Sequence, residues 1–146
     1  MGESPTHVFA RNGFDVKIKD GAVVSLRYLN DLFDTEYIWP ERRLGDVDLA
    51  YRKPDGKWQR VQTEKLAGSG MERIPSDDTY AIDYRVSDGG EITLTVGLSY
   101  DFTDKGLIYS ISLANESSCA VEIGDIALPF PMNGLFEWGK DPNKCV

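Results

Sequence analysis

The sequence predicts an all-β fold, an antiparallel β-sandwich. Apolar residues recur at every second position over most of the chain, as in strands that are buried on one face. Turn-forming pairs such as Asp-Gly separate these stretches, and no apolar stripe at helical spacing persists over three turns. The 146 residues, of which 41% are hydrophobic, suffice for one domain with a single core.

The first two predicted strands form a hairpin. Apolar and polar side chains alternate over residues 14–18 and 24–28, and Asp20–Gly21 between them fits a type I′ turn. The alternation then breaks over residues 30–45, which we interpret as a long loop. Within that loop, residues 36–39 are a candidate for a short edge strand.

A second hairpin and a meander account for the later part of the chain. Alternation resumes at residues 47–51 and again at 58–61, on either side of the polar Pro54–Asp55–Gly56 turn. Residues 64–70 are weakly patterned and are compatible with a brief helix without requiring one. Further strands are predicted at residues 80–86, 92–102, 107–113 and 120–130.

These elements divide the chain into three segments. Residues 1–7 are predicted to be an N-terminal tail, residues 8–131 the β-sandwich domain, and residues 132–146 an irregular C-terminal tail. The last segment carries Phe136 and Trp138 but no closing strand on which to bury them. We therefore expect the chain to be the leading part of a longer protein, with the sandwich incomplete.

The charge balance limits the classes of partner. Sixteen Lys and Arg stand against 24 Asp and Glu, which gives a net charge of −8, and no basic stripe occurs. A nucleic acid or an anionic membrane surface would be repelled, and no apolar run approaches the ~20 residues of a membrane-spanning helix. We expect no nucleic-acid or membrane partner. The compartment stays open, with a secreted or periplasmic location favoured.

The residues that most catalytic sites need are scarce. His7 is the only histidine, and we interpret it as a solvated residue of the tail before the first strand, which leaves no Ser-His-Asp or Cys-His arrangement. Cys119 and Cys145 are too few for a disulfide framework or a zinc site, and they pair only if the fold brings them together. No glycine loop for phosphate is present. We predict no catalytic residue and no cofactor.

Two groups of carboxylates are candidate calcium ligands. Asp31, Asp34 and Glu36 form one group, and Asp46 with Asp48 forms the other. Neither matches the twelve-residue calcium loop with its glycine and terminal glutamate. We interpret Asp46 and Asp48 as solvent-facing residues of a strand whose opposite face carries Val47 and Leu49. No metal site is predicted.

The tryptophans are the candidate binding residues. Trp39, Trp58 and Trp138 lie outside the main apolar stripes, and sugar rings stack their C–H faces on such side chains. The alternative is that these residues fill the edges of the core or contacts between domains.

Two stretches of the sequence resemble a known family. Asn12–Gly13–Phe14 to Ile18, followed by residues 20–26, and residues 108–115, followed by Val121 to Phe130, are similar to the first part of galactose-mutarotase-like β-supersandwich domains. The similarity covers most of residues 8–131. It implies an N-terminal domain of a bacterial glycoside hydrolase-like protein, followed by an α/α barrel that carries catalysis. The histidines and the glutamate used by the mutarotases have no counterparts here beyond the single His7.

Three functions are compatible with these observations. The first is a non-catalytic β-sandwich domain of a carbohydrate-active enzyme that supports an adjacent catalytic domain of the same protein. The second is a stand-alone carbohydrate-binding module that uses the tryptophans. The third is a structural sandwich that contacts protein through an exposed edge strand. The expected partners are accordingly carbohydrate or the adjacent catalytic domain.

Overall fold

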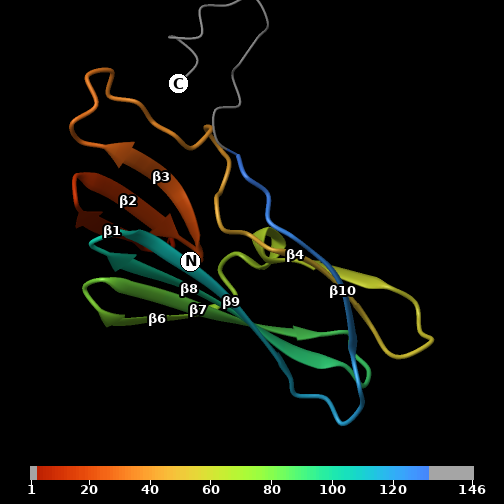
Figure 1. Cartoon of the computed structure of the whole chain (residues 1–146). Coiled ribbons are helices and arrows are strands. Elements are labelled where there is room, and N and C mark those ends of the chain that lie inside the picture. Colours follow the sequence, from red (N-terminus) through yellow and green to blue (C-terminus); the bar gives the residue numbers. More distant parts are fainter. Residues whose placement is uncertain (1–2, 132–146) are drawn as a thin grey trace, which may run out of the picture.

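The computed structural model describes residues 3–131, which form an all-β sandwich (Figure 1). Ten strands and one 3₁₀ turn occur in this range. The strands are β1 (Thr6–Arg11), β2 (Phe14–Lys19), β3 (Ala22–Tyr28), β4 (Asp48–Arg52), β5 (Gln59–Gln62), β6 (Met71–Ser76), β7 (Thr79–Ser87), β8 (Thr93–Thr103), β9 (Gly106–Asn115) and β10 (Glu122–Ala127). The 3₁₀ turn η1 (Thr63–Leu66) follows β5, and no helix in the described range could span a membrane.

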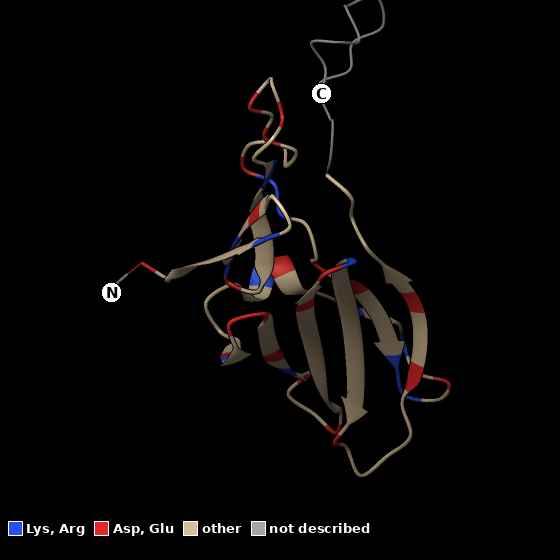
Figure 2. Cartoon of the chain, turned by 60° about the vertical axis from the view of Figure 1, so that its left-hand side comes forward, with Lys and Arg blue, Asp and Glu red and all other residues tan. Residues whose placement is uncertain are grey.

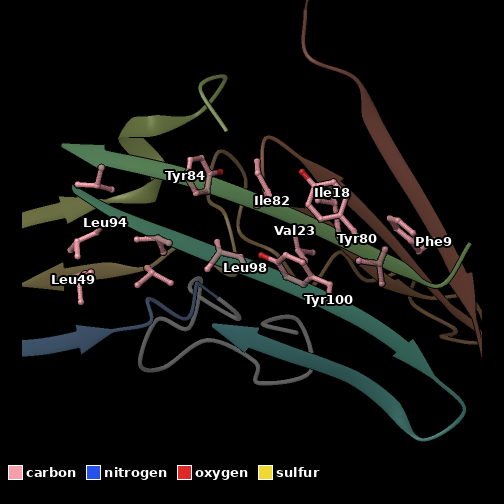
Figure 3. Close-up of a cluster of buried hydrophobic side chains, with 14 of the residues drawn as sticks. Phe9, Ile18, Val23, Leu49, Tyr80, Ile82, Tyr84, Leu94, Leu98 and Tyr100 are labelled. Atoms are coloured by element: carbon pink, nitrogen blue, oxygen red, sulfur yellow. The ribbon is translucent and has the colours of Figure 1, made fainter. Parts of the chain in front are cut away.

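The strands form three antiparallel sheets. Their orders are β1-β2-β3, β10-β4-β5 and β6-β7-β8-β9. Inward-facing side chains of all three sheets belong to one apolar cluster, in which the two three-stranded sheets cover one face of the four-stranded sheet (Figure 3). An isolated bridge between Val23 and Leu44 ties β3 to the loop that leads into β4. One core therefore serves the whole described range.

Most predicted elements are confirmed. The β2–β3 and β4–β5 hairpins, the long loop after β3 and the β7–β8–β9 meander lie where the alternation predicts them. The brief helix considered for residues 64–70 is present as the single turn η1. The last predicted strand is shorter than expected, and it leaves the meander to pair with β4 in another sheet.

Two strands were missed, for physical reasons. β1 has one buried apolar side chain, that of Phe9, and its neighbours on that face are His7 and Arg11, so the alternation was not visible. β6 combines charged residues with Pro75, a composition that favours an edge strand or a loop. The interpretation of His7 as a residue before the first strand is wrong, because β1 already begins at Thr6.

Every second residue of β8 contributes to the core. Alternate residues of β8 from Leu94 to Phe102 point inward, and each is at most 7% exposed. The largest fully buried side chains are those of Tyr80, Tyr84 and Tyr100, which are drawn in Figure 3 among aliphatic neighbours. Because buried hydroxyl groups need hydrogen-bond partners, this core must supply polar atoms as well as apolar contacts.

The polar atoms come from the Asp20–Gly21 turn between β2 and β3, which lies inside the sandwich. Both residues have positive φ, 49° and 85°, as a type I′ turn requires. The Tyr100 hydroxyl donates to the Gly21 carbonyl (2.8 Å), and the Tyr84 hydroxyl donates to the Asp20 carbonyl (2.9 Å). The Gly21 amide donates to the Tyr80 hydroxyl (3.0 Å). Tyrosines of the four-stranded sheet thus hold the turn of the opposite sheet.

A buried ion pair extends this network and corrects one expectation. Asp46 is only 6% exposed, so its interpretation as a solvent-facing residue is wrong. Arg43 Nη2 donates to Asp46 Oδ1 (3.1 Å) and to the Asp20 carbonyl (2.7 Å), and Thr63 Oγ1 donates to Asp46 Oδ1 (2.9 Å). Burial raises the pKa of Asp46, and the Arg43 guanidinium and the Thr63 hydroxyl offset part of that rise.

Removing one hydroxyl from this network tests its contribution. We predict that Tyr100→Phe lowers the free energy of unfolding by about 1 to 3 kcal/mol, because the buried Gly21 carbonyl loses its hydrogen bond. Tyr28→Phe is the matched control, since the Tyr28 hydroxyl is exposed and should cost less than about 0.5 kcal/mol. Urea unfolding measures both, and equal losses in the two variants would contradict the assigned role.

Candidate functional site

His7 has a defined environment that the sequence did not indicate. Its side chain is 21% exposed, and its Nε2 lies 3.2 Å from Glu72 Oε2. The Tyr80 hydroxyl donates to the other oxygen of Glu72 (2.7 Å) and accepts from the Gly21 amide. This chain of contacts leads from the surface to the buried turn and ends on backbone atoms. It therefore fits a structural role better than proton transfer to a substrate.

The carboxylates of the long loop are occupied by hydrogen bonds within the protein. Asp31 accepts from the Phe33 amide (3.0 Å) and the Thr35 amide (3.1 Å), and Asp34 pairs with Arg27 (2.9 Å). Hydrogen bonds from Thr35 and the Phe33 amide hold the pKa of Asp31 below its ordinary value. Within residues 3–131, no group of three or more His, Cys, Asp or Glu side chains could hold a metal ion.

Glu36 binds the loop to β3. Its carboxylate accepts from the Ser25 hydroxyl (2.5 Å), the Leu26 amide (2.8 Å) and the Ile38 amide (3.1 Å). Burial raises the pKa of Glu36, but these hydrogen bonds outweigh it, and the pKa lies below its ordinary value. Glu36 thereby fixes the backbone directly before Trp39.

One side of the Trp58 ring is covered by an arginine. Trp58 lies directly before β5 and is 50% exposed, but the Arg52 guanidinium carbon lies 4.3 Å from its ring centroid. On β10, a Cβ at Gly124 would come within 3.0 Å of the Trp58 ring, so the ring packs against bare backbone there. Trp58 joins β4 to β10, and a sugar would have to displace Arg52 to stack on that side of the ring.

The two tryptophans within residues 3–131 contact different parts of the chain. Trp39 is half-buried in the long loop, and its amide donates to the Pro131 carbonyl (3.1 Å). Trp58 packs beside Gly124 within β10, whereas Pro131, the partner of the Trp39 amide, follows the end of that strand. Trp138 lies outside the described residues, as does Cys145. Cys119 is a half-buried free thiol.

A groove opens at one end of the sandwich, between the β2–β3 hairpin and the β8–β9 turn. Its volume is about 320 Å³. Arg11 at its rim donates to the Phe102 carbonyl (3.1 Å) and pairs with Asp104 (2.7 Å) and Asp78 (2.6 Å), so its charge is already matched. The groove therefore fits an apolar group better than an anion. Its apolar walls are formed by Phe14, Val16, Leu26, Phe102 and Leu107.

β10 carries exposed apolar side chains on the inner side of its sheet. Every residue of this strand is exposed. Ile123 and Ile126 pair with Tyr51 and Leu49 of β4, whose side chains lie in the core, so both isoleucines point to the inner side of their sheet. They nevertheless remain 41% and 46% exposed, because β10 is the outer strand and no described residue covers them fully.

The facing sheet is also incompletely covered on this side. Tyr109, Ile111 and Leu113 of β9 pack against the core but stay half-buried, although their partners on β8 are fully buried. We call the side of the sandwich where β9 and β10 are the outer strands the open side; both strands lie in the right-hand half of Figure 2. One signal for the open side is visible in the sequence, namely the apolar residues that follow the last predicted strand.

The pKa of Glu36 predicts a pH-dependent contribution to stability. Because the folded-state pKa is lowered, the stabilisation is fully present above the unfolded pKa near 4.5 and is lost as pH falls through the folded pKa. We predict that Glu36→Gln lowers the free energy of unfolding by about 1 to 2 kcal/mol at neutral pH. Urea unfolding as a function of pH should show this difference shrink in acid. A difference that is independent of pH would contradict the assignment.

The packing of Trp58 predicts a structural effect of its removal. We expect Trp58→Ala to lower the free energy of unfolding by about 1 to 2 kcal/mol, through loss of the Arg52 contact and the packing on β10. Trp58→Phe, which keeps an aromatic ring, should lose less. Thermal unfolding and titration with soluble polysaccharides measure both properties. Sugar binding that is lost in Trp58→Ala at unchanged stability would restore the stacking role.

Comparisons with known proteins do not identify the chain. No family of related sequences, no curated protein and no solved structure matches it. The all-β sandwich is shown by the structure itself. The resemblance to galactose-mutarotase-like domains stays a prediction that depends on the residues quoted for it.

Proposed function

We propose that this chain is a non-catalytic β-sandwich domain of a carbohydrate-active enzyme, and that it supports an adjacent catalytic domain of the same protein. The observation that carries the proposal is the open side, where inward-pointing isoleucines of β10 remain exposed. The resemblance of residues 8–131 to the leading part of a supersandwich supplies the enzyme class. The role is to offer a preformed apolar surface on which the next domain packs.

The apolar surface continues beyond β10. Leu128 is 49% exposed and Phe130 is 72% exposed, and both follow the strand directly. Exposed apolar residues that occur singly need no explanation, whereas a contiguous set indicates a contact surface. Of the two acidic residues of β10, Glu122 pairs with Arg52, which leaves Asp125 between the isoleucines. A largely apolar protein surface fits this set better than a hydroxylated sugar.

The geometry of the tryptophans favours this reading over a stand-alone carbohydrate-binding module. Trp58 is engaged by Arg52, and Trp39 lies in a loop that Glu36 holds against β3. A stacking platform needs aromatic faces that are open to the ligand. Arg52 instead covers one side of the Trp58 ring, and Trp39 is half-buried.

Hydrogen exchange tests the proposal. We predict that the amides of β10 exchange at least tenfold more slowly in a parent protein that continues beyond Val146 than in the 146-residue chain, because the next domain covers them. The amides of β5, at the other edge of the same sheet, are the internal control and should not change. Equal exchange of β10 in both proteins, or a gene without any following domain, would contradict the proposal.

A pair of substitutions separates docking from general stability. Ile126→Asp should lower the melting temperature of the parent protein by several degrees, because a charge would be buried against the next domain. Val8→Asp is the matched control, since Val8 is 57% exposed on β1, away from the open side. In the 146-residue chain, both changes should have small and similar effects.

A further inference from the structure

β9 is an unprotected edge strand. It hydrogen-bonds to β8 through ten consecutive residue pairs without a register shift, and within residues 3–131 no strand pairs with its other edge. An outer strand of this length presents a row of unpaired backbone amides and carbonyls to solvent. Proteins normally protect such edges with charged side chains, proline or bulges, because a second strand can add to them.

Among the outer strands that the structure describes, β9 alone lacks this protection. Gly106–Asn115 contains no Lys, Arg, Asp, Glu or Pro, which is visible in Figure 2 as an arrow without charged colours. Each of the other outer strands of the described sheets, β1, β3, β5, β6 and β10, carries at least one charged residue, and β6 also has a proline. The lack of charge on β9 is therefore a feature of this strand and not of the protein, which carries 27% charged residues.

We propose that β9 pairs with β9 of a second copy of this chain, antiparallel and about a two-fold axis, so that the two four-stranded sheets become one continuous sheet. Two acidic chains with a net charge of −8 each repel over most of their surfaces, and the neutral β9 edge is where they can approach most closely. An antiparallel pair of identical strands is self-complementary, because each outward amide meets a carbonyl and the reverse.

The side chains of β9 fit this arrangement. Directly opposite residues in an antiparallel pair point to the same face, so the inward row of Tyr109, Ile111 and Leu113 would lie beside the same row of the second copy. That contact covers side chains that are half-buried in the single chain. On the outer face, Ser110 and Ser112 are small and uncharged, so nothing obstructs the approach of the second strand. The dimer uses the β9 edge of the open side, whereas the proposed function depends on the exposed isoleucines of β10, so mass measurements on the 146-residue chain test the dimer without a following domain.

The oligomeric state of the 146-residue chain tests the proposal. Sedimentation equilibrium over the micromolar to millimolar range should show a species of twice the 16.3 kDa chain mass. Added salt should strengthen this dimer, because it screens the repulsion between two acidic chains while the contact itself carries no charge. A wild-type chain that stays monomeric over the whole range overturns the proposal.

A charge on the edge should dissociate the dimer. Ser110→Lys places two lysines near each other at the middle of the paired strands, and we expect it to raise the dimer Kd by roughly tenfold or more. The substitution lowers the net negative charge, so a loss of dimer cannot come from added overall repulsion. Ser99→Lys is the matched control: Ser99 pairs directly with Ser110 but lies one strand inward, and its dimer should match the wild type.

Folding of each variant is checked by circular dichroism and thermal unfolding before its mass is measured. If Ser110→Lys does not fold, Ser112→Lys on the same face of β9 replaces it, with the same expected dissociation. An edge variant that is folded and dimerises as tightly as the wild type overturns the proposal, as does a Ser99→Lys chain that dissociates to the same extent.

Discussion

The hydrogen bonds between the Asp20–Gly21 turn and the tyrosines of the facing sheet are the interaction on which the rest of the sandwich depends. A hairpin turn normally lies in water, where its carbonyls and amides are hydrated. Here the turn is inserted into the core, and tyrosines of β7 and β8 replace the water. A Cβ at Gly21 would overlap the Tyr84 hydroxyl, so the close approach also requires glycine. The same hydroxyls that satisfy the turn therefore set how the two sheets meet.

Much of the fold could be predicted because most strands alternate strictly. β8 and its neighbours bury one face and expose the other, and a period of two is visible in the sequence alone. β1 and β6 could not be predicted, because they become strands by pairing with β2 and β7 and show no apolar alternation of their own. The departure of β10 to another sheet could not be predicted either, since local alternation carries no information about which strand is adjacent.

The contacts of the candidate site residues were harder to predict from the sequence than the fold. Alternation around Val47 placed Asp46 on the solvent side, whereas Arg43 and Thr63 stabilise it inside. Its residue type makes Trp58 a candidate for sugar stacking, but the access of a ligand to its ring depends on Arg52 and on the absence of a side chain at Gly124. Such properties arise from contacts between distant segments. By contrast, the lack of charge on β9 can be read directly from the sequence, but it gains meaning only once the strand is known to be an outer one.

The buried turn also constrains the order of events during biosynthesis. Tyr100 follows Gly21 by 79 residues, so the ribosome completes the β2–β3 hairpin long before the tyrosine that binds it exists. At ordinary elongation rates the interval is roughly 4 to 16 seconds. For that time the apolar side of the hairpin has no facing sheet, and its turn stays hydrated. Docking of the two sheets must then strip this water from the turn, which makes the arrival of the β7–β8–β9 meander the step at which the nascent chain can first become a compact domain.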